Sequence, residues 1–239
     1  MAPKKNIHSL IFTIIVAGTF LIFILLILGM FYYPGGSKFN FEQQGYSFSE
    51  NYLSDLGRVY TFNAEYNLIS RLLFALAITI GGIGLITFYL LMPKLLLYDL
   101  KVKKISLAGG IIGIISSLIC ISIAYIPMDI NLTIHRTAVY MFGVICLPAH
   151  ILLAIAIFYD KNYPNIYGWL FMCYSIFLTT YILLWIIFKF ESPYTQEVTK
   201  IVGQKIILML EATNVIIQSF GAQKIIQKQK NLDDNSIAV

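Results

Sequence analysis

The sequence predicts an all-α fold, a polytopic bundle of six transmembrane helices. The first observation is composition, because 58% of the 239 residues are hydrophobic and only 12% are charged, against about 25% charged in a soluble domain. The second is length, since the apolar residues gather in six runs that approach or exceed the ~20 residues needed to cross a bilayer as a helix. Lipid offers no partner for unpaired backbone groups, which favours helices over open strands. The runs are 9–32, 67–92, 105–126, 137–158, 166–188 and 201–222.

The first run follows a basic start, "MAPKKNIHS", as a signal peptide would. Its apolar part is longer than the 7–15 residues typical of a signal core, and "MFYYPGG" is not an A-x-A-type cleavage site. We therefore expect a retained transmembrane helix.

The lysines predict the orientation of the bundle. The cluster "KVKK" at 101–104 and the tail "QKIIQKQK" fall on the same side as the N-terminus, so the positive-inside rule places both termini in the cytoplasm. Residues 33–66 then form a long outer loop, and 1–239 form a single transmembrane domain. The net charge of +5 is explained by this rule, so membrane lipids, and no nucleic acid, are the expected partners. We expect a prokaryotic plasma membrane; the sequence indicates no oligomeric state.

Polar residues gather where three segments reach the outer side. In "YIPMDINLTIHRTAVYMFG", Pro127 ends a helix because proline has no amide to donate. The neighbouring segments are "SENYLSDLGRVY", before the second run, and the start of the sixth run. Opposite charges at a shared depth favour a polar binding site, with ordinary ion pairing at the interface as the alternative. The predicted ligand-binding residues are Asp55, Arg58, Asp129, His135, Arg136, Gln204 and Lys205.

No metal or cofactor is expected from the histidines. His135 and His150 are fifteen residues apart on one run, or ~22 Å at 1.5 Å per residue, and His8 lies at the opposite face. They cannot share one zinc ion. A site formed by Asp55, Asp129 and His135 stays open as a minor alternative.

The sixth run carries a polar stripe. Gln204, Glu211 and Gln218 recur every seven residues, with Asn214 on the same face, and we expect this face to turn inward. A carboxylate near the bilayer midplane is costly, ~2.5–3.5 kcal/mol for the comparable Asp on insertion scales. His150 lies at a similar depth or somewhat further in, so a Glu211–His150 hydrogen bond is geometrically possible, either as a link between helices or as a proton or ligand relay.

Small residues indicate close helix packing in the third run. Gly109 and Gly113 are four residues apart, the spacing that lets helix backbones approach. Cys120, Cys146 and Cys173 lie on different runs without a CxxC pair, so we expect buried packing residues that form no disulfide.

Three short motifs resemble a known family. "NYLSDLG", "YIPMDINLTIHRTAVYMFG" and "VGQK" are similar to the ordered signatures of the six-helix prokaryotic membrane family called domain of unknown function nine hundred and ninety-eight, with lysine where arginine is commoner. The chain also looks distantly like the DRAM-type six-helix proteins. The resemblance implies the architecture and a site, but no reaction. Its residues here are Ser54, Asp55, Gly57, Pro127, Asp129, His135, Gln204 and Lys205.

Three functions are compatible with these patterns. The first is a binding protein whose outward site holds a lipid headgroup or small anion on Arg136 and Lys205. The second is an integral-membrane lipid hydrolase or transferase, in which His135 acts as general base. Its other candidate catalytic residues are Asp129 or Asp55 to orient the imidazole, Ser54 as nucleophile and Lys205 to stabilise an anion. The third is a small-solute or proton-coupled transporter using the polar stripe, although no broken helix or inverted repeat is present in the sequence.

Overall fold

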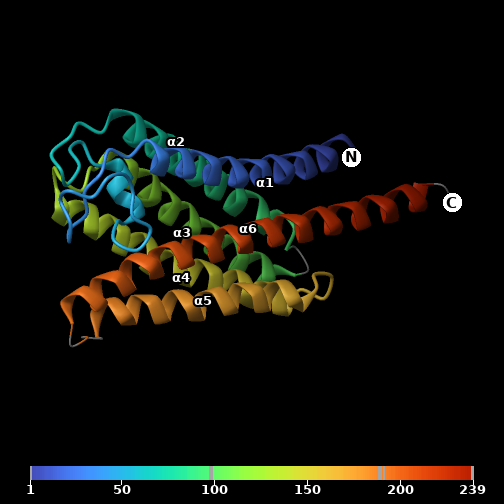
Figure 1. The fold of residues 1–239 in the computed structure, drawn as a ribbon. Coiled ribbons are helices and arrows are strands. Elements are labelled where there is room, and N and C mark those ends of the chain that lie inside the picture. The colour runs from blue at the N-terminus through green and yellow to red at the C-terminus, as the bar shows by residue number, and fades with distance from the viewer. Residues whose placement is uncertain (1, 97–98, 188–189, 191, 238–239) are drawn as a thin grey trace.

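The computed structural model describes the backbone of residues 2–96, 99–187, 190 and 192–237, and it confirms the six-helix fold (Figure 1). Six helices are long and apolar enough to span a membrane, and the described residues contain no strand. Residue 188 of the predicted fifth run and residues 97–98 of the turn before α3 lie outside the described residues. The long helices are α1 Ala2–Phe31, α2 Leu68–Leu91, α3 Leu100–Tyr125, α4 Leu132–Tyr159, α5 Asn165–Ile186 and α6 Pro193–Ile237.

Two helices begin where a side chain caps them. The carboxylate of Asp99 accepts a hydrogen bond from the Val102 amide at 2.8 Å and starts α3. Asn131 accepts from the Ile134 amide at 3.0 Å and starts α4, five residues before the predicted start. Such caps satisfy amides that a first helical turn leaves unpaired.

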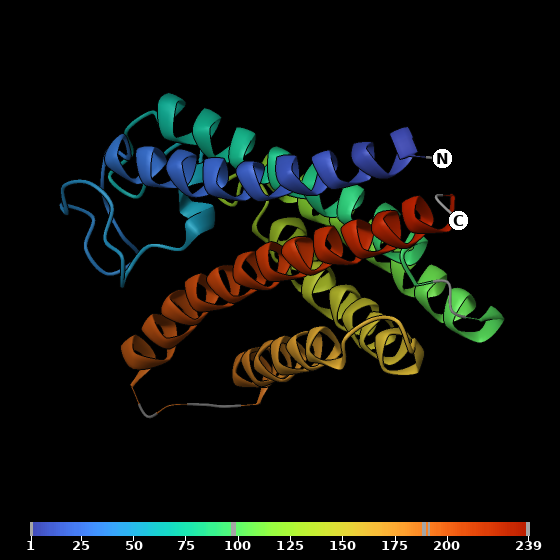
Figure 2. The ribbon, with the colours of Figure 1, turned by 90° about the vertical axis from the view of Figure 1, so that its right-hand side faces the viewer.

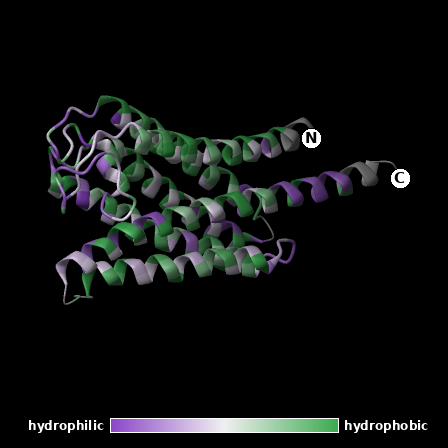
Figure 3. Ribbon diagram, viewed as in Figure 1, coloured by the Kyte–Doolittle hydropathy of each residue, from purple (hydrophilic) through white to green (hydrophobic). Residues whose placement is uncertain are grey.

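The sixth helix is much longer than the predicted run 201–222. It has 45 residues, which corresponds to ~67 Å at 1.5 Å per residue, about twice the thickness of a hydrocarbon core. The apolar run marks only the part that suits lipid. Glutamine and lysine are good helix formers, so the helix continues through them on both sides, and the hydrophilic C-terminal part of α6 projects beyond the other helices (Figure 3).

The helices form a closed ring. Each long helix packs against the next one in the chain, and α6 packs against α1, as Figures 1 and 2 show. Both termini lie at one end of the bundle, which we call the terminal end, and residues 33–66 lie at the other, the loop end (Figure 1). The cytoplasmic position of the terminal end stays a prediction.

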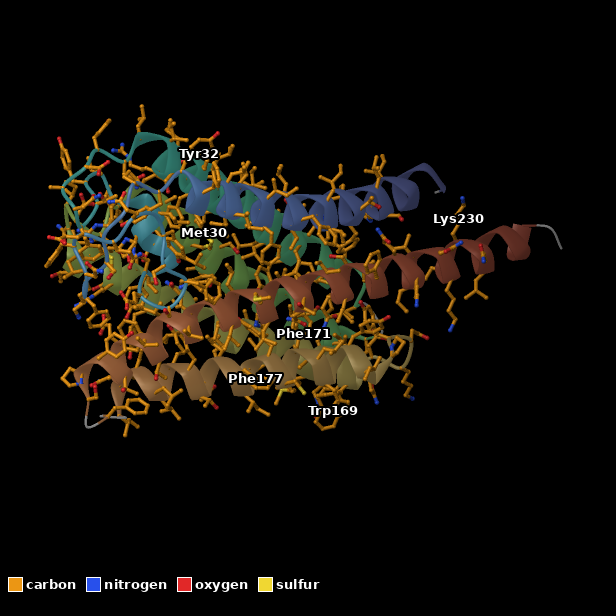
Figure 4. The ribbon with its side chains drawn as sticks, in the orientation of Figure 1. Met30, Tyr32, Trp169, Phe171, Phe177 and Lys230 are labelled. Atoms are coloured by element: carbon orange, nitrogen blue, oxygen red, sulfur yellow. The ribbon has the colours of Figure 1, made fainter. Side chains whose placement is uncertain are left out.

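The faces of α5 illustrate how the ring meets lipid. Phe171 is fully buried and points toward the interior, whereas Trp169 and Phe177 are more than half exposed and point away from the bundle (Figure 4). Large apolar side chains on the outside are expected where the solvent is a bilayer.

Glycines on α3 bring three helices together, which confirms the packing prediction. A Cβ atom on Gly109 would lie 3.1 Å from the Ala149 carbonyl oxygen of α4. A Cβ atom on Gly113 would lie 2.3 Å from the ring of Tyr89 on α2. The absence of side chains therefore positions the Tyr89 ring against α3.

The long loop is folded into the bundle. Its 3₁₀ helix η1, Leu53–Gly57, is buried along its whole length. Leu53 and Leu56 join a core cluster with Leu26 of α1 and Phe74 of α2. A Cβ atom on Gly57 would lie 2.6 Å from the Phe74 ring, so glycine is needed there. We call residues 51–60 the plug.

Candidate functional site

Side chains from the turn between α3 and α4 and from α6 hold the plug through its main chain. The carboxylate of Asp129 accepts hydrogen bonds from the Val59 amide at 3.0 and 3.1 Å and from the Tyr60 amide at 2.9 Å. The side-chain oxygen of Gln204 accepts from the Leu53 amide at 2.9 Å. The short 3₁₀ helix of the plug leaves some of its buried backbone amides without a main-chain partner, and these side chains accept their hydrogen bonds.

Lys205 is part of the same attachment. Its ammonium donates to the Asn51 carbonyl oxygen at 2.6 Å and lies over the rings of Phe48 and Tyr46, with centroids at 4.9 and 5.5 Å. The residue is only 3% exposed. A carbonyl oxygen and two aromatic faces stabilise the cation, and no water-facing surface is left for an anion.

Asp55 and Arg58 act within the plug. One Asp55 oxygen accepts from the Tyr52 amide at 2.8 Å and the other lies 3.7 Å from the Arg58 guanidinium. Arg58 also donates to the Tyr60 carbonyl oxygen at 3.1 Å and stacks on Phe62. Burial raises the pKa of Asp55 from 3.8 to about 6, although Arg58 acts to lower it.

A cavity of about 440 Å³ lies inside the helix ring. Its lining comes from all six long helices and from the plug, and it is mostly apolar. Polar or ionisable side chains near the loop end include those of Ser54, His135, Arg136 and Gln204; those deeper in the bundle include Cys120, Cys146, Tyr174 and Glu211.

The structure divides the predicted binding residues into two groups. His135, Arg136 and Gln204 line the cavity. Asp55, Asp129 and Lys205, which we expected to share that pocket with His135, are not among its lining residues and bind plug backbone or Arg58 instead. Arg58 likewise does not line the cavity, and its guanidinium contacts Asp55, Tyr60 and Phe62. The missed factor is that a buried 3₁₀ segment needs hydrogen-bond partners, and a sequence does not reveal that a loop will be buried.

His135 has one free nitrogen at the cavity wall. Its Nδ1 lies 2.6 Å from the Ile126 carbonyl oxygen. A carbonyl oxygen can only accept, so Nδ1 carries the hydrogen, and a neutral ring leaves Nε2 as an acceptor. Nε2 is buried and has no hydrogen-bond partner among the described residues. The Ile126 carbonyl, and neither Asp55 nor Asp129, therefore orients this imidazole.

The predicted polar stripe of α6 faces inward. Glu211, Asn214 and Gln218 are all buried, and the His150 Nε2 atom lies 3.5 Å from a Glu211 oxygen. The Gln218 amide donates to the Tyr167 carbonyl oxygen of α5 at 2.7 Å and to Asn214 at 3.4 Å. The two side chains are therefore neighbours, but neither Glu211 oxygen accepts a hydrogen bond from His150.

Two residues beside His150 were not predicted as site residues. The Tyr89 hydroxyl lies 2.8 Å from its Nε2, and the Cys146 sulfur lies 3.7 Å from its Nδ1. The signal in the sequence was the spacing of Cys146 and His150, four residues apart on one helix face. Of the three cysteines expected to be buried, only Cys146 is; Cys120 is partly buried, and Cys173 of α5 is exposed.

The three motifs of the family resemblance meet at the plug. η1 comes from the first motif, Asp129 from the second, and Gln204 and Lys205 from the third. The chain matches no family model, no curated protein and no solved structure. Membership of the family stays a prediction based on these motifs.

Proposed function

We propose that this multi-pass membrane protein binds an anionic lipid, with the acyl chain in the cavity and the headgroup beside Arg136 and His135. The observation that carries the proposal is the cavity itself, which is apolar over most of its wall and carries its cationic side chain at the loop end. A volume of about 440 Å³ falls in the range of small-molecule sites, ~300–1,000 Å³.

The apolar part of the wall suits a hydrocarbon chain. It includes Ile15 and Ile22 of α1, Phe74 of α2 and Leu178 of α5. Gly18 and Gly84 also line it, and their missing side chains leave room between the helices. A polar solute would find few partners along this wall.

The groups at the loop end suit a headgroup that is both an anion and a hydrogen-bond donor. Arg136 is exposed and lines the cavity; its planar guanidinium pairs well with phosphate. The unpartnered Nε2 of His135 accepts a hydrogen bond from an O–H group. We therefore expect a glycerol-phosphate headgroup to bind better than a choline-phosphate headgroup, which lacks the hydroxyl and the net charge.

The test compares headgroups and variants. Purified protein in nanodiscs is titrated with phosphatidylglycerol or phosphatidylcholine, and retained lipid is counted by native mass spectrometry. Arg136→Gln and His135→Asn should each weaken phosphatidylglycerol binding by about tenfold, which corresponds to ~1.4 kcal/mol. Arg71→Gln, a loop-end arginine of α2 that does not line the cavity, should leave it unchanged. Equal retention of both lipids by all variants would contradict the proposal.

The hydrolase alternative has one supporting observation. Ser54 lines the same cavity as His135, and its hydroxyl lies 4.0 Å from the Met128 sulfur. In this alternative the free Nε2 takes the serine proton. Ser54→Ala and His135→Asn would then each lower lipid turnover by ~10²–10⁴-fold, whereas a pure binding protein shows no turnover in either form.

A further inference from the structure

We propose that Cys146, His150 and Glu211 form a buried site for one zinc-type divalent ion at the deep end of the cavity. Cys146 and His150 lie on α4, and Glu211 lies on α6. One ligand atom from each lies within 4.8 Å of the others. The site does not depend on the lipid proposal, because none of its ligands binds the headgroup there.

The distances fit a tetrahedral ion after small adjustments. The Cys146 sulfur lies 3.7 Å from His150 Nδ1 and 4.0 Å from Nε2, and Nε2 lies 3.5 Å from a Glu211 oxygen. Zinc bonds of ~2.3 Å to sulfur and ~2.0 Å to nitrogen place these atoms ~3.6 Å apart in a tetrahedron. Coordination through Nδ1 requires the Glu211 oxygen, which lies 3.5 Å from Nε2, to move toward Nδ1. Because the three ligand atoms lie within 4.8 Å of one another, side-chain shifts of ~1 Å would bring them to the tetrahedral separation.

Glu211 gives the independent reason to expect a ligand. It is 7% exposed, and neither carboxylate oxygen has a hydrogen-bond partner among the described residues. A bare carboxylate is costly at this depth in a membrane. A divalent cation with one thiolate, one carboxylate and one neutral imidazole has no net charge, so ion binding removes that cost without adding a new one. Binding releases the thiol proton to water.

The surroundings hold the imidazole in place. The Tyr89 hydroxyl lies 2.8 Å from His150 Nε2, so a ring that coordinates through Nδ1 donates its Nε2 hydrogen to Tyr89. The Phe171 ring stacks on His150 and the Tyr174 ring meets it edge to face, both with centroids at 5.0 Å; Phe171 points from α5 toward the interior in Figure 4. Metal-binding histidines are commonly oriented by such a hydrogen bond on the second nitrogen.

The cavity provides access and an open position. Cys146 and Glu211 both line it, so an ion can enter from the hollow interior. Three protein ligands and one position facing a cavity are typical of zinc sites that bind an exchangeable water. Mixed sulfur, nitrogen and oxygen ligands favour zinc over the harder calcium and magnesium ions.

The test is direct metal binding by the whole chain, purified without a histidine tag. After incubation with Zn²⁺ and gel filtration, plasma mass spectrometry should find about one zinc per chain. Cys146→Ser and Glu211→Gln should each weaken binding at least tenfold. Cys173→Ser, an exposed cysteine of α5, is the matched control and should bind as the unaltered chain does.

Cobalt gives a readout of the ligand atoms. Co²⁺ should produce a thiolate-to-metal absorption band in the near ultraviolet, present with Cys173→Ser and absent with Cys146→Ser. The wild-type spectrum alone tests thiolate ligation, even where a variant elutes as aggregate. No zinc and no cobalt band in the wild type, or unchanged binding after both substitutions, would overturn the proposal and leave the cluster as packing only.

Discussion

The buried carboxyl of Asp55 makes the stability of the plug depend on pH, and Asp55→Asn removes that dependence. The pKa rises from 3.8 in the unfolded chain to about 6 because the group is buried in η1. Between these values the folded state binds the proton more tightly than the unfolded state, so the unfolding free energy falls as pH rises. The contribution is complete below pH 3.8 and is lost as pH rises through about 6.

The magnitude follows from the size of the change. Each pKa unit corresponds to ~1.4 kcal/mol, so the rise from 3.8 to about 6 corresponds to about 3 kcal/mol. Asparagine keeps a side-chain oxygen for the Tyr52 amide and never ionises. Asp55→Asn should therefore be more stable than the wild type at neutral pH, by up to about 3 kcal/mol, and equal to it near pH 4.

The assay is reversible unfolding in mixed micelles, followed by circular dichroism as the fraction of denaturing detergent rises, at several pH values between about 4 and 7. Glu42→Gln, an exposed carboxylate of the same loop, is the control and should keep the wild-type dependence. A lower stability of Asp55→Asn at neutral pH would refute the reasoning, since it would mean that the contact with Arg58 at 3.7 Å outweighs burial.

Three further predictions test packing, the plug and topology. Gly113→Ala should lower the free energy of unfolding by ~1–3 kcal/mol through overpacking, because the new methyl group overlaps the Tyr89 ring. In Gly84→Ala the new methyl group meets no atom within 4 Å, so this variant should be as stable as the wild type. Equal stabilities of the two variants in the micelle assay would contradict this prediction. Asp129→Ala removes the acceptor of both plug amides and should accelerate trypsin cleavage within 33–66 at least about tenfold, each charge-assisted hydrogen bond contributing ~1.5–3 kcal/mol; an unchanged cleavage rate would show that apolar packing alone holds the plug. In intact cells, a membrane-impermeant maleimide should label Glu42→Cys and spare Asn231→Cys, and the reverse pattern would invert the predicted orientation.

The fold could be predicted because a chain that crosses lipid must pair its backbone groups internally, which favours helices. Each apolar run became a helix, and the pair Gly109 and Gly113 correctly marked close packing on α3. The extent of α6 could not be predicted from hydropathy, because helix formation continues in water wherever the residues favour it. Hydropathy predicts the part of a helix that lies in the membrane, and it does not predict where the helix ends.

The site was predictable only in part. The sequence placed Asp129, His135 and Lys205 at one end of the bundle, where they lie. It could not distinguish a charge that faces a ligand from one that satisfies backbone, since that depends on whether residues 33–66 fold into the bundle or away from it. The cluster around His150 required knowledge of which face of α2 meets α4, because Tyr89 enters it from a helix sixty residues away.

The closure of the ring between α1 and α6 also has a consequence for biosynthesis. At this seam the Gln223 amide donates to the Ser9 carbonyl oxygen at 3.3 Å and to the Thr13 hydroxyl at 2.9 Å. During translation α1 to α5 enter the bilayer in order, each with its neighbour already present, while the inner face of α1 waits for the last helix. A nascent chain of five helices lacks the α6 wall of the cavity and leaves the contact faces of α1 and α5 without their partner. The pocket is therefore created in a single late step, when the newest segment meets the oldest.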